Sequence, residues 1–185
     1  MTDALTADAS RNEILKIAIG GLVSGVLTPL LLDAIDLLAP APAMLRLALV
    51  AVPFAVLVLV VVRRRSANPV WAALAASLVT MIAFVAAVNG AVYIDGQMAG
   101  AAKTMRSLFA GLAGGLVGSA VMALGIALLP AGPRKAAAWV PMLVTGTMAG
   151  SLLALDTSLG LDRTSFLYPV WQAAVGVRLA MALRR

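Results

Sequence analysis

The sequence predicts an all-α, polytopic integral membrane protein built as a bundle of six transmembrane helices. Apolar residues make up 62% of the 185 residues and charged residues 12%, and the mean hydropathy is +1.02. An average soluble domain has about 45 to 50% apolar and about 25% charged residues. A soluble chain of this size with so much more apolar surface could not bury it. The apolar residues also fall into six runs of roughly the 17 to 25 residues that a helix needs to cross a bilayer.

Residues 1–14 are expected to form a short cytoplasmic polar tail, and residues 15–185 a single six-span membrane domain. The tail lacks the basic region, apolar core and cleavage site of a signal peptide, so we expect it to remain on the mature protein. Its polar residues between Asp8 and Ser10 are expected to cap the helix that follows.

The first predicted span covers residues 15–38. Pro29 is expected to kink this helix, because proline lacks the backbone donor and leaves a carbonyl that needs a hydroxyl, a water or a neighbouring helix. Asp33 and Asp36 lie near the far end of the span, just before a proline-rich turn at residues 39–43.

The second and third predicted spans cover residues 44–62 and 70–88. Pro53 interrupts the second span, which ends in three consecutive arginines. The third span is expected to stop at Asn89 and the glycine that follows it. Residues 89–106 then form the longest connection, and their mildly amphipathic pattern indicates a segment on the membrane surface.

The fourth predicted span, residues 107–129, contains no charge and carries small residues on two neighbouring faces. One face has Gly111 and Gly115 four residues apart, and the next has Gly114 and Gly118. Because small residues let helix backbones approach closely in lipid, we expect this helix to be the packing hub of the bundle.

The fifth and sixth predicted spans cover residues 139–155 and 166–183. Gly146 and Gly150 repeat the four-residue spacing in the fifth span. The sixth span contains Arg178 five residues before its end and is followed by two terminal arginines.

Eight glycines in these spans are predicted to be helix-packing residues, because they occur at the small-residue spacing that close helix pairs use. They are Gly21, Gly25, Gly111, Gly114, Gly115, Gly118, Gly146 and Gly150. A glycine-lined pore or cleft, or a homodimer face, is the functional alternative for the same positions.

Lysines and arginines near the spans predict that both termini are cytoplasmic, most simply in a bacterial inner membrane. With this orientation nine basic residues lie inside, namely Arg11, Lys16, Arg63, Arg64, Arg65, Arg134, Lys135, Arg184 and Arg185. Four lie outside, namely Arg46, Lys103, Arg106 and Arg163. The positive-inside rule favours this arrangement. The net charge of +6 then reflects topology and lipid contact rather than nucleic-acid binding, so the expected partners are the lipid bilayer and a second copy or another membrane protein.

Three short sequence matches recur in the same order and suggest an inverted 3+3 repeat, with halves at residues 15–90 and 107–185. Residues 20–23 match 114–117, residues 52–56 match 140–144, and residues 69–73 match 169–173. Because each half has three helices, the second half would enter the bilayer from the opposite side, as in many transporter folds. Chance similarity among a few apolar residue types is the alternative.

Five polar residues are candidates for a substrate or ion pathway: Asp33, Asp36, Asp156, Gln172 and Arg178. The three aspartates would form an acidic outer mouth for hard cations, unless Asp36 is solvated and Asp33 pairs with Arg46. Arg178 is an ionisable group within a span and therefore a functional candidate, unless it extends to the lipid headgroups. Gln172 is expected to make an interhelical hydrogen bond.

Cysteine and histidine are both absent, which removes the usual thiol nucleophile, general base and soft metal ligands. We therefore expect no enzyme activity, no metal site and no cofactor. The leading function is a small transporter- or channel-like protein that binds or translocates a small solute or ion between glycine-lined helices. The alternative is a non-catalytic membrane subunit that assembles with, anchors or senses for a partner protein, because few polar groups lie within the spans.

Overall fold

The computed structural model describes residues 2–38, 42–161 and 165–183, and within these ranges the chain is helical with short connections and no strand. The helices are α1 Thr2–Leu38, α2 Ala43–Val50, α3 Val52–Arg65, α4 Val70–Gln97, α5 Lys103–Ala127, the 3-10 turn η1 Ala136–Ala138, α6 Val140–Gly150, α7 Leu152–Ser158 and α8 Leu167–Ala182. The predicted all-α fold is confirmed.

Four helical segments of the described chain are long and apolar enough to cross a bilayer: Ser10–Ile35, Val70–Gln97, Lys103–Ala127 and Ala136–Ser158. The pair α2 and α3, bent by 48°, passes the same test if it is counted as one broken span. A stripe of exposed apolar side chains on α4, formed by Trp71, Leu74, Leu78 and Ile82, is typical of a face that meets lipid. The molecule is therefore a membrane-protein candidate with four to five spans.

The predicted count of six spans is not confirmed, because α8 is short. It has 16 residues, about 24 Å of helix at about 1.5 Å per residue, whereas the hydrocarbon core is about 30 Å thick. The sixth predicted span began at residue 166, but the chain is still turning there and becomes helical at Leu167.

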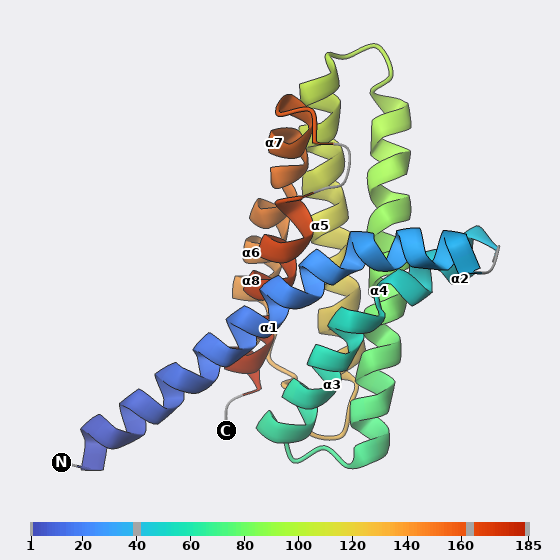
Figure 1. Cartoon of the computed structure of the whole chain (residues 1–185). Coiled ribbons are helices and arrows are strands. Elements are labelled where there is room, and N and C mark those ends of the chain that lie inside the picture. Colours follow the sequence, from blue (N-terminus) through green and yellow to red (C-terminus); the bar gives the residue numbers. More distant parts are fainter. Residues whose placement is uncertain (1, 39–41, 162–164, 184–185) are drawn as a thin grey trace.

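The predicted boundary of the first helix is wrong. The backbone of α1 is helical from Thr2, so no cap between Asp8 and Ser10 begins it, and residues 2–14 belong to the same helix as the predicted span. Residues 1–19 contain neither glycine nor proline, so nothing in the sequence stops the helix there. Figure 1 shows this N-terminal part of α1 reaching out beyond the bundle. The helix also continues through Pro29.

The predicted surface connection at residues 89–106 is also wrong. Helix α4 continues through Asn89 to Gln97, and α5 begins at Lys103, so the connection between them is only residues 98–102. The Asn89 side chain donates a hydrogen bond to the carbonyl of Val85 one turn earlier (2.7 Å), which accommodates it within the helix rather than at its end. The two helices form a long antiparallel hairpin (Figure 1).

Pro53 interrupts the second span as predicted. It stands in the first turn of α3, where its missing donor costs little. Ala51 lies at the break, with its N–H donating to the carbonyl of Ala48 (3.2 Å). Buried side chains of α3, including Phe54 and Val58, then join the main core together with residues of α4, α5, α6 and α8.

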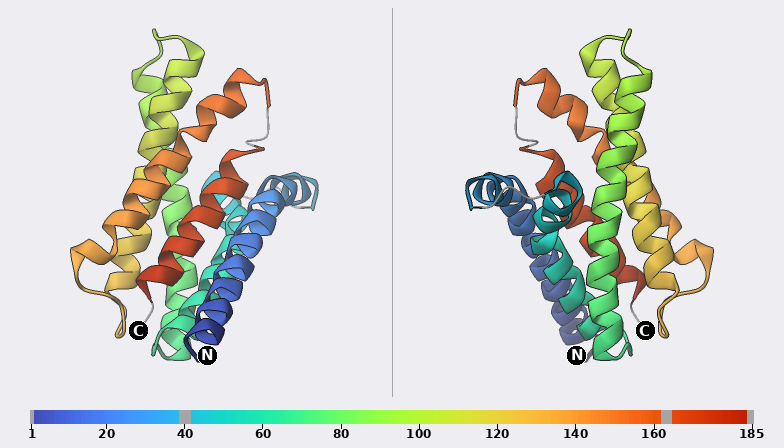
Figure 2. Two further views of the ribbon diagram at one scale, coloured as in Figure 1. Left: turned by 90° about the vertical axis from the view of Figure 1, so that its left-hand side faces the viewer. Right: turned by 90° about the vertical axis from the view of Figure 1, so that its right-hand side faces the viewer.

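The bundle places the chain ends and two basic segments at one end. Both termini lie toward the lower end in Figures 1 and 2, the end at which the connections that follow α3 and α5 also lie. Helices α4 and α6 run away from this end, and α5 and α8 run back toward it (Figure 2). Arg63 to Arg65 end α3, and Arg134 and Lys135 lie in the connection after α5. The terminal pair Arg184 and Arg185, together with Asp162 and Arg163, lies outside the described residues.

The inverted repeat is not confirmed at the level of matched residues. A Cβ added to Gly20 would meet α3, whereas one added to its match Gly114 would meet α4. A Cβ on Gly21 would meet α8, whereas one on its match Gly115 would meet α6. An inverted repeat would make α3 equivalent to α6 and α4 equivalent to α8, so the two glycine faces are exchanged relative to that expectation.

Candidate functional site

An apolar cleft of about 200 Å³ lies between α4, α5, the α6–α7 segment and α8. Phe84 and Val88 of α4 and Tyr168 and Trp171 of α8 form its walls, and Leu153 of α7 adds to them. None of the described residues that line it is charged. An enclosed apolar cavity of about 150 Å³ can hold benzene, so this cleft has room for a small apolar molecule or part of an acyl chain.

The floor of the cleft is glycine backbone. Gly111, Gly114 and Gly115 of α5 and Gly150 of α6 all line it. A Cβ on Gly111 would overlap the carbonyl of Gly150, and one on Gly115 would overlap the carbonyl of Gly146. These positions therefore bring α5 and α6 into backbone contact and at the same time leave the floor free of side chains.

The second glycine face of α5 is turned toward α4. A Cβ on Gly114 would lie 3.0 Å from the carbonyl oxygen of Ala87, and one on Gly118 would lie 3.0 Å from the Cβ of Ala87. The two faces that the sequence pattern distinguishes on this helix thus serve different neighbours, α6 on one side and α4 on the other.

The aromatic walls of the cleft are held by neighbouring rings. The ring of Trp171 meets that of Phe54 edge-on, with centroids 5.8 Å apart, and the rings of Phe84 and Tyr168 are 5.6 Å apart. The Trp171 side chain is 9% exposed, and its Nε1–H has no hydrogen-bond partner within the part of the chain that the structure describes. Such a donor is costly to leave unsatisfied in an apolar surrounding.

Gln172 makes the interhelical hydrogen bonds expected of it, next to the cleft wall but facing α1. Its Oε1 accepts from the hydroxyl of Ser24 (2.7 Å), and its Nε2–H donates to Oγ1 of Thr28 (2.9 Å). The Thr28 hydroxyl donates to the carbonyl of Ser24 (2.9 Å), and the carbonyl of Gly21, 3.0 Å from Ser24 Oγ, is an alternative acceptor for the single O–H of Ser24. All three side chains are buried, so this is a satisfied polar contact between α1 and α8 and not an open polar path.

Backbone contact accompanies this polar contact. A Cβ on Gly21 would overlap the backbone of Ala173, and one on Gly25 would overlap that of Pro169. The predicted packing positions on α1 are therefore the places where α1 crosses α8, as Figure 2 shows for the two helices.

Asp156 lies at the end of α7, where its carboxylate holds the start of α8. The side chain is 1% exposed. Its Oδ1 accepts from the N–H of Phe166 (3.0 Å) and its Oδ2 from the N–H of Leu167 (3.1 Å). Both oxygens are thus used by backbone donors that the first turn of a helix would otherwise leave unpaired.

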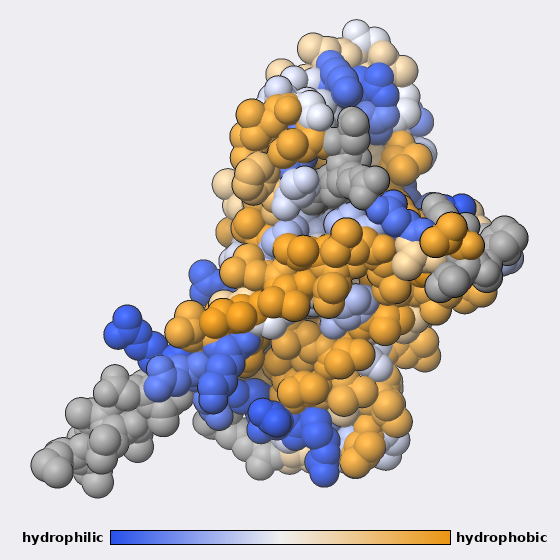
Figure 3. Space-filling view, in the orientation of Figure 1, coloured by the Kyte–Doolittle hydropathy of each residue, from blue (hydrophilic) through white to orange (hydrophobic). Residues whose placement is uncertain are grey.

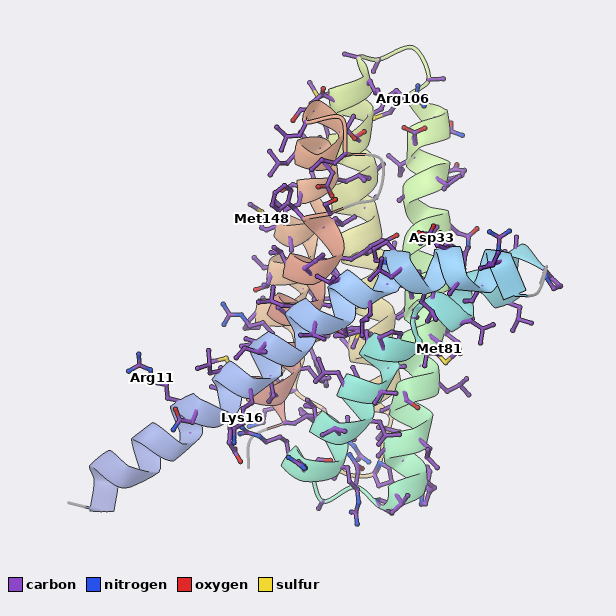
Figure 4. All side chains as sticks on the ribbon, in the orientation of Figure 1. Arg11, Lys16, Asp33, Met81, Arg106 and Met148 are labelled. Carbon is purple, nitrogen blue, oxygen red and sulfur yellow. The ribbon has the colours of Figure 1, made fainter. Side chains whose placement is uncertain are left out.

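The other acidic candidates are placed differently. Asp33 is exposed on α1 (Figure 4), and the side chain of Asp36 lies outside the described residues. Within the described residues, no three side chains of the Asp, Glu, His or Cys type are close enough together to hold a metal ion. The acidic outer mouth stays a prediction. Of its three aspartates, Asp156 already has hydrogen-bond partners for both carboxylate oxygens.

Arg178 lies on α8 away from the cleft residues and is half-buried. Its Nε–H donates to Oγ1 of Thr145 on α6 (3.1 Å). No described carboxylate lies within ion-pair distance of it. The guanidinium thus cross-links α8 to α6 through a hydroxyl.

Sequence reasoning missed the aromatic walls of the cleft. Phe84 lies within an apolar run that carries no distinguishing pattern, and Tyr168 and Trp171 have the spacing of ordinary interfacial aromatics. The glycine spacing on α5 was the one signal that pointed to this region. In comparisons with known proteins the chain matches no family model, no curated protein and no solved structure.

Proposed function

We propose that the protein is a transporter-like membrane protein whose glycine-floored cleft binds a small apolar or amphipathic solute. The observation that carries this proposal is the cleft itself: about 200 Å³ of apolar space, walled by aromatic rings and floored by backbone. Pockets for small ligands are commonly of this kind, mostly apolar with few polar groups. The absence of charged side chains from its described lining favours an uncharged solute over an ion.

Trp171 contributes its ring to the cleft wall. Its Nε1–H is itself fully buried and is therefore not offered to a molecule in the cleft. An apolar body matches this lining better than a polar one does.

The helix contacts support an inverted arrangement of two halves, as transporter folds often have. Helix α1 contacts α3 and α8, and in the same way α5 contacts α6 and α4. The contact of α3 with α4 likewise corresponds to that of α6 with α8. The proposed repeat is thus one of helix arrangement, with a residue register different from the matched glycines, and α8 is its shortened sixth crossing.

The proposed location is a bacterial inner membrane, with both termini in the cytoplasm. Its support is the collection of basic segments at the end of the bundle where both termini lie (Figure 1). The lipid would then surround the exposed apolar stripes of α1 and α4.

Binding in the cleft is tested by quenching of Trp171 fluorescence in a background that carries Trp71→Phe and Trp139→Phe, so that Trp171 is the one tryptophan left of three, with a brominated fatty alcohol as the probe. Trp71 is 60% exposed and would report lipid rather than cleft. We expect saturable quenching that the unbrominated alcohol reverses. Quenching that does not saturate, or that the unbrominated alcohol leaves unchanged, would show that the cleft does not bind such molecules.

A matched pair of variants tests whether the cleft is the site. Val92 lines the cleft edge and is 66% exposed, whereas Val70 lies on the same helix outside the cleft and is 56% exposed. Val92→Phe should weaken the apparent affinity for the alcohol several-fold by narrowing the cleft, and Val70→Phe should leave it unchanged. Equal affinities in the two variants would argue against the cleft.

The alternative function is a non-catalytic membrane subunit, and the contact of Gln172 with Ser24 and Thr28 favours it. The buried polar side chains of the α1–α8 contact are hydrogen-bonded to one another, which suits a tightly packed subunit better than a polar permeation path. If the alcohol does not bind, the subunit function is favoured. The protein should then co-purify in a fixed ratio with a second membrane protein.

A further inference from the structure

A second hollow, separate from the cleft, lies between α1 and α3. It has a volume of about 270 Å³ and is lined by Glu13, Lys16 and Ile17 of α1 and by Leu57, Val60, Val61, Arg64 and Arg65 of α3. We propose that this α1–α3 groove binds one anionic phospholipid, with the headgroup phosphate at the basic end and an acyl chain along the apolar end. The inference is independent of the function proposed for the cleft.

The groove has a polar end and an apolar end, and two contacts fix its direction. At one end Arg65 Nη2 pairs with Glu13 Oε2 (2.6 Å). Seven residues further along α1, a Cβ on Gly20 would lie 3.0 Å from Leu57 Cδ1. The charged residues therefore gather near the end of the bundle, and Ile17 and Leu57 continue the groove toward its middle.

The basic end carries an excess of positive charge. Three cationic side chains and one carboxylate line the groove, which leaves two positive charges. Arg65 is engaged with Glu13, whereas Lys16 and Arg64 are exposed and have no described carboxylate within ion-pair distance. Two such cations lining one groove suit a phosphate group, to which lysine and arginine both donate.

The groove lies where the surface changes from hydrophilic to hydrophobic, the pattern expected at a boundary between headgroups and hydrocarbon. Figure 3 shows hydrophilic residues along the lower part of α1 and the end of α3, directly below a continuous hydrophobic band. Lys16 lies beside the end of α3 in Figure 4. Basic pockets between helices on the cytoplasmic side of membrane proteins bind anionic lipid headgroups in this position.

The apolar half of the groove favours a lipid over a free anion. Ile17, Leu57, Val60 and Val61 form half of the lining residues, and inorganic phosphate would leave these side chains without a partner. A phospholipid fills both halves at once, because its chain continues along the apolar wall where its headgroup ends.

The proposal is tested by the thermal stability of the full chain in a neutral detergent, with phosphatidylglycerol or phosphatidylcholine of the same acyl chains added. Phosphatidylglycerol should raise the unfolding midpoint and saturate at about one lipid per chain, and phosphatidylcholine should raise it much less. Inorganic phosphate at equal ionic strength should have no such effect. Equal effects of both lipids, or an equal effect of phosphate, would overturn the proposal.

Two double variants with the same loss of charge locate the effect. Lys16→Gln with Arg64→Gln removes two positive charges from the groove, and Arg134→Gln with Lys135→Gln removes two from exposed positions in the connection after α5. The groove variant should bind phosphatidylglycerol at least ten-fold more weakly, and the control variant should bind it as the unaltered protein does. Equal weakening in both, or in neither, would contradict the assignment.

A third double variant exchanges the two basic residues and tests whether the glutamine variant acts only by disturbing the fold. Lys16→Arg with Arg64→Lys keeps both cations in the groove and should retain the lipid effect. If this exchange loses the effect as completely as the glutamine variant does, the two side chains act on the fold and the lipid site is refuted.

Discussion

At the scale of single residues, burial decides what a polar side chain does. Asp156 is one of the few acidic groups in an apolar chain, and its position at the end of a predicted span suggested a cation site. Its two oxygens instead accept the N–H groups of Phe166 and Leu167. A carboxylate in this position replaces the hydrogen bonds that the first turn of α8 cannot form within itself, so its role in the described structure is to hold the last helix.

Asp156→Asn should lower the stability of the protein by about 1 to 3 kcal/mol, because the amide removes the charge and presents N–H groups toward backbone donors. Unfolding in mixed detergent, followed by circular dichroism, measures this change. Ser158→Ala is the control: Ser158 is exposed two residues later, and its loss should change stability by less than about 0.5 kcal/mol. An unchanged midpoint for Asp156→Asn would contradict the helix-holding role.

Gln172 is also a buried polar residue, but here the sequence predicted its contact correctly. An amide within an apolar run has few ways to be satisfied except on a neighbouring helix, and the bonds to Ser24 and Thr28 are of this type. The residue type alone therefore indicated the kind of contact, although the helix that supplies the partners could not be known before α1 and α8 were seen together.

At the scale of elements, α5 organises its neighbours through two glycine faces. Gly111 and Gly115 meet the backbone of α6, and Gly114 and Gly118 meet α4. In lipid there is no water to exclude between helices, so van der Waals contact at such close approach carries much of the association. The same lack of side chains produces the floor of the cleft.

Gly115→Ala should destabilise the bundle by more than about 1 kcal/mol, because its methyl group would overlap the carbonyl of Gly146. Gly96→Ala on α4 is the matched control, since a Cβ there would have nothing within 4 Å. The control should be neutral or slightly stabilising, as alanine favours helix by about 1 kcal/mol over glycine. Thermal midpoints in one detergent compare the two variants, and equal midpoints would show that close packing at Gly115 is unimportant.

At the scale of the whole molecule, the bundle separates a basic end from the tip of the α4–α5 hairpin. Arg64 and Arg134 lie at the end that holds both termini, and Gly100 lies in the connection at the opposite tip (Figure 2). If the molecule crosses the membrane as proposed, these ends face different compartments.

Single cysteines test this orientation cleanly, because the natural sequence has none. Cysteines at Arg64 and Arg134 should react with an impermeant maleimide from the cytoplasmic side, and a cysteine at Gly100 from the other. Labelling of intact cells before and after lysis distinguishes the sides. Labelling of Arg64→Cys and Gly100→Cys from the same side would refute the proposed topology.

Properties that depend on residues near one another in the sequence were predictable from the sequence. Composition and the lengths of apolar runs determine that the chain is helical and suited to a bilayer, because every backbone polar group in hydrocarbon must be paired within its own segment. The four-residue spacing of glycines likewise determines which faces of α5 are bare. The predictions that were wrong at this level concerned the ends of helices. Neither Asn89 nor the polar residues before Leu15 form a helix end, and α4 and α1 continue through them.

The tertiary structure alone decided which faces meet. Trp71 and Trp171 follow the same Pro-Val sequence, yet one is 60% exposed and the other 9%, and the matched glycine pairs at residues 20–21 and 114–115 face different helices. The cleft and the α1–α3 groove both join segments distant in sequence. The periodicity of a helix specifies its apolar and bare faces, but the neighbour of each face depends on how all helices pack together, because lipid and protein offer apolar side chains nearly the same surrounding.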